Sequence, residues 1–256
     1  MKPLEHYAAE LTEQGYTIME GVLDARQTQE ARDALQEIFD RESGIAVQRK
    51  WHTAQHQAAY MLPEKHELFR QLPLNEPVLS LMRLLLGERC VLSSLNGLTM
   101  VPGGEDQPLH LDQPETIPGQ VLAINAMHCL DDFTVANGAT RVIPGSQNRV
   151  LPPGMERGAF ESETIRLEAP AGSLIAFNGG LWHAGSRNTT DQPRRAIHAY
   201  YCRPWIVPQW NYPRSLSPEV TATLSDEQKR LFGYYAEPMW YDSHTDQFMH
   251  LPRPVG

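Results

Sequence analysis

The sequence predicts a mainly β protein, a β-sandwich or jelly roll with helical additions at both ends. Two changes in the sequence pattern along the chain favour this class. Short apolar runs separated by Pro, Gly and Asn clusters, typical of strands and turns, fill about residues 90–205. A helical part precedes them at about residues 1–88, and a C-terminal helix and polar tail follow at 206–256. Because no repeat, linker or second apolar core interrupts the chain, we expect one domain over residues 1–256.

The first clear helix is predicted to follow Asp24. Asp24 has the character of an N-cap, and Gln27 stands three residues later as its capping-box partner. The apolar positions that follow at helical spacing are Ala31, Leu35, Ile38 and Phe39. Residues 41–65 lack a clear period, so we expect a lid or rim loop there, with Trp51 as a candidate substrate contact.

Two further helices are predicted from their end signals. We expect Asn75 to cap one of them and Gly87 to end it. The apolar stripe of that helix would be Val78, Leu81, Met82 and Leu85. Ser225 and Gln228 form a second capping-box pattern, which predicts the C-terminal helix.

Charge and cysteine content limit the classes of partner. The net charge of −9 argues against sequence-independent binding of nucleic acid or of an anionic membrane, because both need a basic face. No apolar run approaches the length of a transmembrane helix, and the N-terminus has no apolar signal region. Cys90, Cys129 and Cys202 are odd in number and far apart, which favours reduced, buried thiols in a cytoplasmic protein.

Two histidines and an aspartate are the candidate metal ligands. His110 and Asp112 are two residues apart, so on a strand their side chains would face the same way. His183, in a Gly-rich stretch, would supply a third ligand. Mixed nitrogen and oxygen ligands with open positions suit Fe(II) in oxygenases, but the same set also satisfies a tetrahedral zinc site with one water. The ligand types alone leave both metals open.

Arg194, eleven residues after His183, indicates what else the site binds. We expect Arg194 to point inward and to line the barrel, because Ile197, Ala199 and Tyr201 share the face of Arg195. A buried guanidinium is costly without an anionic partner, and a carboxylate gripped by both nitrogens would satisfy it. Arg195 is expected to point to the opposite side and to be solvated.

These residues resemble the phytanoyl-CoA dioxygenase-like family. The resemblance rests on His110-x-Asp112, His183, the spaced Arg194 and the stretch "DDFTVANGATRVIPGSQNR", and it extends over about Leu4 to Trp205. It implies a double-stranded β-helix, a jelly-roll or cupin-like fold. It also implies an Fe(II)/2-oxoglutarate oxygenase that uses O2, oxidises a small molecule and releases succinate and CO2.

The resemblance assigns a role to each candidate residue. His110, Asp112 and His183 match the iron ligands, and Arg194 matches the group that binds the distal carboxylate of 2-oxoglutarate. Thr140 and Gln107 match further polar contacts to the cosubstrate, and both can hydrogen-bond a carboxylate without adding charge. With Asp112 present, hydroxylation or a related oxidation is favoured over halogenation, because the halogenases of this fold lack that carboxylate. A monomer or homodimer is expected.

This chain departs from the family pattern at two positions. Gln147 stands where many relatives have histidine, and Gly185 stands where some have a hydroxyl residue. Two other classes of protein stay open at this point. One is a zinc or manganese hydrolase or isomerase that does not use O2, and the other is a non-catalytic binding module.

Overall fold

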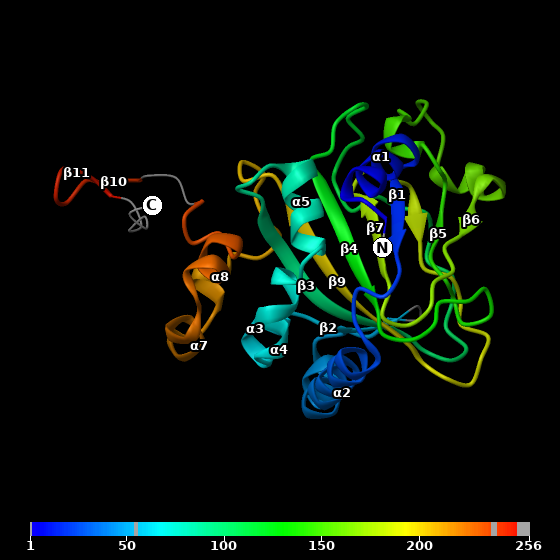
Figure 1. The fold of residues 1–256 in the computed structure, drawn as a ribbon, viewed down its shortest axis with the longest axis horizontal. Coiled ribbons are helices and arrows are strands. Elements are labelled where there is room, and N and C mark those ends of the chain that lie inside the picture. The colour runs from blue at the N-terminus through cyan, green and yellow to red at the C-terminus, as the bar shows by residue number, and fades with distance from the viewer. Residues whose placement is uncertain (1, 54–55, 237–239, 250–256) are drawn as a thin grey trace.

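The centre of the fold is a six-stranded antiparallel sheet (Figure 1), in a computed structural model that describes residues 2–53, 56–236 and 240–249. Across this sheet the strands are β1 (Tyr16–Met19), β7 (Leu174–Asn178), β4 (Ala123–Cys129), β9 (Arg194–Cys202), β3 (Val91–Met100) and β2 (Gln57–Ala59). A second, three-stranded sheet has the order β6 (Ile165–Arg166), β5 (Arg141–Val142) and β8 (His183–Ala184). Buried side chains of both sheets pack in one cluster, as in a jelly roll. The predicted fold class is therefore confirmed.

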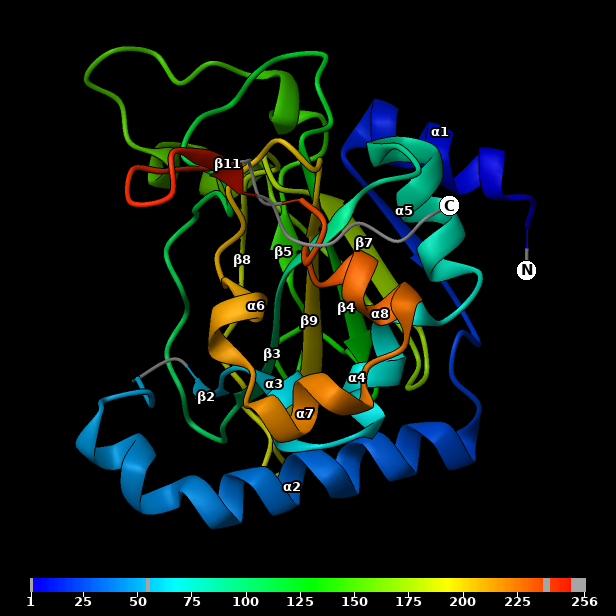
Figure 2. The same cartoon turned by 90° about the vertical axis from the view of Figure 1, so that its left-hand side faces the viewer.

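Helices cover the other face of the large sheet. They are α1 (Leu4–Gln14), α2 (Ala25–Gln48), α3 (Leu62–Lys65), α4 (Leu68–Gln71) and α5 (Val78–Leu86). The long helix α2 runs along one end of the sheet, whereas α1 and α5 lie side by side (Figure 2). Three 3-10 turns, Leu72–Leu74, Ser146–Asn148 and Arg157–Glu163, connect other elements. After β9 come α6 (Tyr212–Ser215), α7 (Pro218–Thr223), α8 (Asp226–Leu231) and the hairpin β10 (Trp240–Asp242) with β11 (Gln247–Met249).

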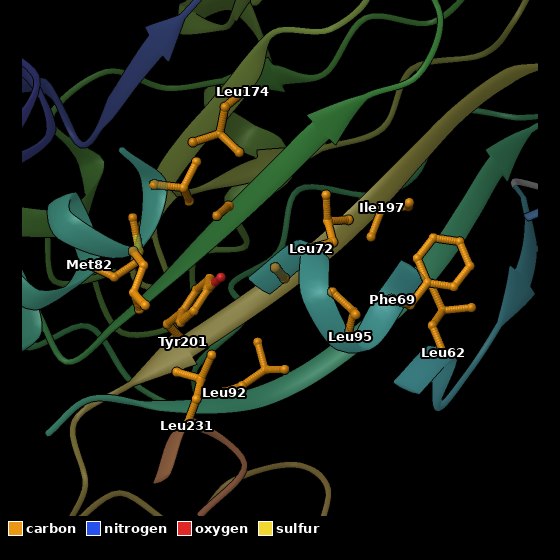
Figure 3. Packing of buried hydrophobic residues seen from close by; sticks show 14 of the residues in the cluster. Leu62, Phe69, Leu72, Met82, Leu92, Leu95, Leu174, Ile197, Tyr201 and Leu231 are labelled. Atoms are coloured by element: carbon orange, nitrogen blue, oxygen red, sulfur yellow. The ribbon is translucent and has the colours of Figure 1, made fainter. Parts of the chain in front are cut away.

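The main hydrophobic core lies between these helices and the sheet. Figure 3 shows helical side chains such as Phe69 and Met82 on the same side of the sheet as Leu95, Ile197 and Tyr201. The alternation along β9 sends Ile197, Ala199 and Tyr201 into this core, and it leaves the intervening residues to the interior between the two sheets. The helices thus stabilise one face of the sheet and leave its other face free to build a site.

The capping boxes at Asp24 and Ser225 are present, and Gly87 ends α5, as predicted. The prediction that Asn75 caps this helix was wrong. Pro77 directly precedes α5. The backbone amide of Ser80 donates a hydrogen bond to Oε2 of Glu76 at 3.1 Å. An acidic side chain at this end satisfies a free amide and suits the helix dipole, so asparagine is not needed.

Three further expectations about local structure were wrong. The predicted loop at residues 41–65 begins too early, because α2 continues to Gln48 and buries Ala46. The first 88 residues also contain two strands, β1 and β2, which complete the two edges of the large sheet. One C-terminal helix was expected, and three short ones are present. Segments of three to six residues have too little periodic signal to be predicted, so contacts with the rest of the chain decide their conformation. The end of the predicted tail, residues 250–256, lies outside the described residues.

All three cysteines are buried and unpaired, as expected from their spacing. No helix among the described residues combines the length and the apolarity that a bilayer span requires.

Gly138 in the "NGAT" stretch holds the loop before β5 against the chain that follows β8. Its φ is +89°, and a Cβ there would lie 2.3 Å from the backbone oxygen of Ser186. We expect Gly138→Ala to lower the free energy of unfolding by about 2–5 kcal/mol, from left-handed strain plus overpacking. Urea denaturation measures this loss.

Gly119→Ala is the matched control for that prediction. Gly119 has a φ of +75° and no described atom within 4 Å of the added carbon, so it should lose only the backbone part, about 1–2 kcal/mol. Equal losses in the free energy of unfolding of the two variants would show that the close approach of Gly138 to Ser186 does not contribute to the effect.

Candidate active site

A backbone pairing brings the two histidine motifs together. The amide of His110 donates to the carbonyl of His183 at 2.9 Å, and the amide of His183 donates back at 3.1 Å. His110 belongs to no strand beyond this single bridge, and Asp112 follows in a bend rather than on the strand that was expected. The Asp112 amide donates to the carbonyl of Gly179 at 3.0 Å, which places the aspartate beside both imidazoles.

Both imidazoles are oriented by their Nδ1 atoms. Nδ1 of His110 lies 3.0 Å from the carbonyl of Pro108, and Nδ1 of His183 lies 2.9 Å from that of Leu181. A carbonyl only accepts, so each Nδ1 carries the proton, and each Nε2 is left with a lone pair in the neutral ring. These Nε2 atoms lie 4.0 Å and 3.5 Å from Oδ1 of Asp112, and the three atoms lie within 4.8 Å of one another. Such a cluster can hold one metal ion.

Asn125 fixes the carboxylate of Asp112. Its Nδ2 donates to Oδ2 of Asp112 at 2.8 Å, so Oδ1 is the oxygen left facing the imidazoles. Burial opposes the charge on Asp112, but the adjacent His183 and the hydrogen bonds from His183 and Asn125 outweigh it and lower the pKa of the carboxyl. The aspartate is therefore ionised and ready to bind a cation.

The two histidines differ in their protonation. Burial and the neighbouring His183 lower the pKa of His110 to about 4, so this ring is neutral near pH 7. Burial also opposes the charge on His183, but Asp112 outweighs it and raises the pKa of His183. A metal ion must displace the proton on Nε2 of His183, because the metal binds to the lone pair of that atom.

Arg194 is buried and points into the same cavity, as predicted. Only 3% of its surface is exposed, and its Nε and Nη1 have no hydrogen-bond partner among the described residues. Its guanidinium carbon lies 3.9 Å from the centre of the Phe133 ring. Burial lowers the pKa of Arg194 to about 10, which still leaves the group charged at neutral pH. A buried cation with unused donors is suited to binding an anion.

A cavity of about 260 Å³ joins the metal-ligand cluster to Arg194. Thr140 lines it and is buried, and its hydroxyl lies 3.9 Å from the sulfur of Met127. Gln107 lines it too, and its Oε1 accepts the amide of Gly185 at 2.8 Å. A side chain at Gly185 would meet Gln107, because a Cβ there would lie 2.7 Å from that oxygen. All six residues singled out from the sequence therefore meet at one cavity.

The comparisons with known proteins show which family the chain belongs to. The family model for phytanoyl-CoA dioxygenase (PhyH) matches residues 11–196. The chain belongs to this family. A PhyH relative, the dioxygenase af480 of Aspergillus fumigatus, is 30% identical over 89% of this chain and 76% of its own length. The uncharacterized protein Rv1501 of Mycobacterium tuberculosis is 29% identical over 93% of this chain and 88% of its own.

Solved structures resemble this PhyH protein in fold. The carbocyclase SnoK from nogalamycin biosynthesis, described as non-heme and alpha-ketoglutarate dependent, has a TM-score of 0.65 at 21% identity, over 78% of this chain and 83% of its own. HygX from Streptomyces hygroscopicus, solved with nickel and 2-oxoglutarate bound, has a TM-score of 0.65 at 16% identity, over 80% and 88% of the two chains. These likenesses support the jelly-roll fold of the chain.

Arg195 differs from its expected place in this PhyH dioxygenase. It lies on the face opposite Arg194, as expected, but it is only partly exposed and is paired rather than free in solvent. Its Nε and Nη2 donate to the two carboxylate oxygens of Asp131 at 2.9 and 3.1 Å. Asp131 lies on the connection that follows β4, and the sequence spacing gives no sign that the two would pair.

Arg141 is a positioning residue that sequence reasoning missed in this PhyH chain. Its Nη1 donates to the carbonyl of Gly185 at 2.7 Å, and its Nη2 donates to that of Gln107 at 2.5 Å. Its Nε contacts Glu161 at 2.5 Å. The guanidinium thus holds together the two segments that carry His110 and His183. Its place directly after Thr140 in "NGATR" was the available signal.

Two other histidines, His198 and His56, line the cavity of the PhyH chain without joining the metal-ligand cluster. His198 lines the cavity with Nδ1 3.3 Å from Nδ2 of Asn125, and burial lowers its pKa to about 3. His56 also lines it, with Nδ1 3.2 Å from Gln107. Trp182 is buried in the core, whereas Trp51 packs edge-on against Tyr60, which lines the cavity.

Proposed function

We propose that the chain is an Fe(II)/2-oxoglutarate-dependent oxygenase that oxidises a C–H bond of a small molecule and releases succinate and CO2. One observation carries the proposal. The cavity that collects two imidazole Nε2 atoms and one carboxylate oxygen also contains a buried guanidinium with unused donors. A metal site alone would explain the triad, but it would not explain Arg194.

The residues fit both groups. Two neutral imidazoles and one carboxylate form the facial set of ligands typical of non-heme Fe(II) oxygenases. In our proposal His110, Asp112 and His183 hold the iron, and Arg194 grips the distal carboxylate of 2-oxoglutarate. Thr140 and Gln107 donate further hydrogen bonds to the same cosubstrate. When bound, the iron and the oxo acid supply the activation of O2 and the oxidation of the substrate.

The chain's own part is to bind, orient and exclude water. The hydrogen bonds to Pro108 and Leu181 keep the Nε2 atoms pointed at the metal, and Asn125 does the same for Asp112. His183, Thr140 and Arg194 are buried, whereas the side chain of His110 is 40% exposed, so a bound substrate would complete the exclusion of bulk water from the reacting atoms. Each group is therefore in place before a substrate arrives.

Hydroxylation is the outcome that we propose, because Asp112 occupies the position that chloride would need. Structural neighbours show how far outcomes can vary on this fold, since SnoK is described as a carbocyclase and SnoN as an epimerase. A zinc or manganese hydrolase would use the triad but would leave Arg194 without a partner, so we rank it below the oxygenase.

Three expectations stay predictions: a small-molecule substrate, a cytoplasmic location and a monomer or homodimer. The buried, unpaired cysteines support a reducing compartment.

Anaerobic titration tests the proposed function directly. Purified protein with Fe(II) and 2-oxoglutarate should develop a weak visible charge-transfer absorption, and admission of O2 with a suitable substrate should release succinate and CO2 in equal amounts. Protein that binds zinc tightly, turns over substrate without O2 and ignores 2-oxoglutarate would instead support the hydrolase.

Asn125→Leu is expected to weaken metal binding without removing a ligand. The variant loses the hydrogen bond that holds Oδ2 of Asp112, and partners of this kind contribute about 10–100-fold in metal affinity. Isothermal titration with Ni(II), a redox-inert stand-in, would measure the change. Asn211→Leu, which removes only the cap of α6, is the matched control. Unchanged nickel affinity in Asn125→Leu would contradict the role given to Asn125.

A further inference from the structure

We propose that the cavity takes the reacting end of an uncharged, oxygen-bearing ring compound, and that Asn96 on β3 donates a hydrogen bond to a carbonyl or ether oxygen of it. This inference rests on the proposed function, because it assumes that the metal and the oxo acid occupy the far end of the cavity. It goes further by naming the substrate class and a residue that selects it.

When the metal and the oxo acid are bound, the cavity has no unpaired charge that could bind a charged substrate. Among the described residues that line it, only Asp112 and Arg194 carry a formal charge when the imidazoles are neutral. The two positive charges of the metal and the one of Arg194 equal the one negative charge of Asp112 and the two of the oxo acid, so the net charge of the cavity is zero. A further charge on the substrate would be buried without a partner, which is costly.

The remaining walls offer neutral hydrogen-bonding groups. Ser94 and Asn96 project from the same face of β3 into the cavity, and His198 and Tyr200 project from β9. Burial raises the pKa of Tyr200 and lowers that of His198, so both are uncharged near pH 7. Such a wall matches hydroxyl, carbonyl and ether oxygens.

Asn96 has a fixed orientation. Its Oδ1 accepts from Nε1 of Trp210 at 3.2 Å and from the amide of Met61 at 3.4 Å. Two donors on this atom decide which end of the side chain is oxygen. Its Nδ2 has no hydrogen-bond partner among the described residues. Asn96 therefore presents N–H donors in the cavity wall that are held in place and have no partner among the described residues.

Aromatic rings lie beside Asn96. Tyr60, which lines the cavity, packs edge-on between Trp51 and Trp210, with ring centres 5.6 Å and 6.0 Å apart. The cavity of about 260 Å³ is smaller than the roughly 300–1,000 Å³ typical of sites for drug-sized ligands, and it must also hold the oxo acid. Only part of a substrate fits inside, so a ring system would lie against Tyr60, which Trp210 supports from behind.

A coenzyme A thioester is a poor match for this opening. Its phosphates would need basic side chains, but among the described residues Arg194 is the only arginine or lysine that lines the cavity, and Lys65, over the Trp51 ring, is paired with Glu42 at 2.7 Å. The chain as a whole carries a net charge of −9. We therefore expect free, uncharged molecules rather than acyl-CoA esters.

Four probes test the proposal on protein loaded with Ni(II) and 2-oxoglutarate. 2-Acetylnaphthalene is neutral and only accepts hydrogen bonds, 2-naphthoate is an anion, 2-naphthylmethylammonium is a cation, and coenzyme A carries phosphates. Dissociation constants come from ligand-observed NMR titration. We expect 2-acetylnaphthalene to bind at least about tenfold more tightly than the three charged probes.

Asn96→Asp is the decisive variant. It keeps an oxygen for Trp210 and Met61 but replaces the donor with a carboxylate oxygen. We expect it to weaken 2-acetylnaphthalene about tenfold and to leave the affinity for 2-oxoglutarate unchanged. Asn211→Asp, which makes the same exchange at the cap of α6 and also keeps its accepting oxygen, should change neither.

The outcomes separate the two proposals. Failure of the unmodified protein to bind Ni(II) and 2-oxoglutarate would overturn the proposed function. Normal binding of both would overturn this inference alone if a charged probe binds most tightly, if no probe binds, or if Asn96→Asp binds 2-acetylnaphthalene as the unmodified protein does.

Discussion

Asp112→Asn is expected to abolish metal binding while preserving the fold. The amide has the shape of the carboxylate and can still accept from Asn125, but it then turns an NH2 group toward the two imidazoles. We expect the affinity for divalent metal to fall by more than about 100-fold, beyond the effect of an outer partner, and oxygen-dependent turnover of 2-oxoglutarate to fall to background. Isothermal titration and succinate release measure these losses.

Asp33→Asn serves as the control for Asp112→Asn. Asp33 is exposed on α2, where it only accepts from Gln29, so the same exchange there should leave metal binding intact. Circular dichroism should be identical for both variants. Wild-type metal affinity in Asp112→Asn would refute the assignment of Asp112 as a ligand.

Arg194→Met is expected to stabilise the cosubstrate-free protein and to abolish its response to 2-oxoglutarate. Nε and Nη1 of Arg194 are buried without hydrogen-bond partners in the part of the chain that the structure describes, and an unsatisfied buried polar group costs about 1–3 kcal/mol. Methionine keeps apolar contact with Phe133 and removes that cost, so the melting temperature should rise by about 2–6 °C. In the unmodified protein with Ni(II), 2-oxoglutarate should raise the melting temperature, because a ligand that binds only the folded state stabilises it. In Arg194→Met with Ni(II), 2-oxoglutarate should leave the melting temperature unchanged.

Arg194→Lys separates charge from geometry in this test. Lysine keeps the positive charge but lacks the planar fork, so a partial response to 2-oxoglutarate is expected. Differential scanning fluorimetry with and without 2-oxoglutarate measures all three proteins. A melting temperature of Arg194→Met that still rises with 2-oxoglutarate as in the unmodified protein would show that the oxo acid binds elsewhere.

Side-chain rules predicted part of the cavity, whereas Thr140 and Gln107 were assigned only from the family resemblance. The two-residue spacing of His110 and Asp112 placed them together, and the alternation along β9 placed Arg194 inward. The proximity of His110 and Asp112 was predicted correctly but for the wrong reason, because Asp112 lies in a bend and is placed by its amide hydrogen bond to Gly179 and by the pairing of His110 with His183.

The residues that support the cavity were not predictable in the same way. Asn125 reaches Asp112 from β4, Arg141 reaches two carbonyls on other segments, and Arg195 pairs with Asp131. Each of these interactions joins parts of the chain that only the register between strands brings together. Asn96 depends in addition on Trp210, which follows β9 in a stretch without regular structure. Periodicity within one segment contains no information about such partners.

The mutual backbone hydrogen bonds of His110 and His183 also limit how such a protein can evolve. Register changes only in whole residues, and a slip of one residue would turn a side chain to the opposite face. Selection can therefore keep or lose the iron site, but it cannot shift the site by small degrees. Loops and helices around the cavity are free of this restriction, so lineages that inherit the same metal centre can diverge widely in the molecules they oxidise.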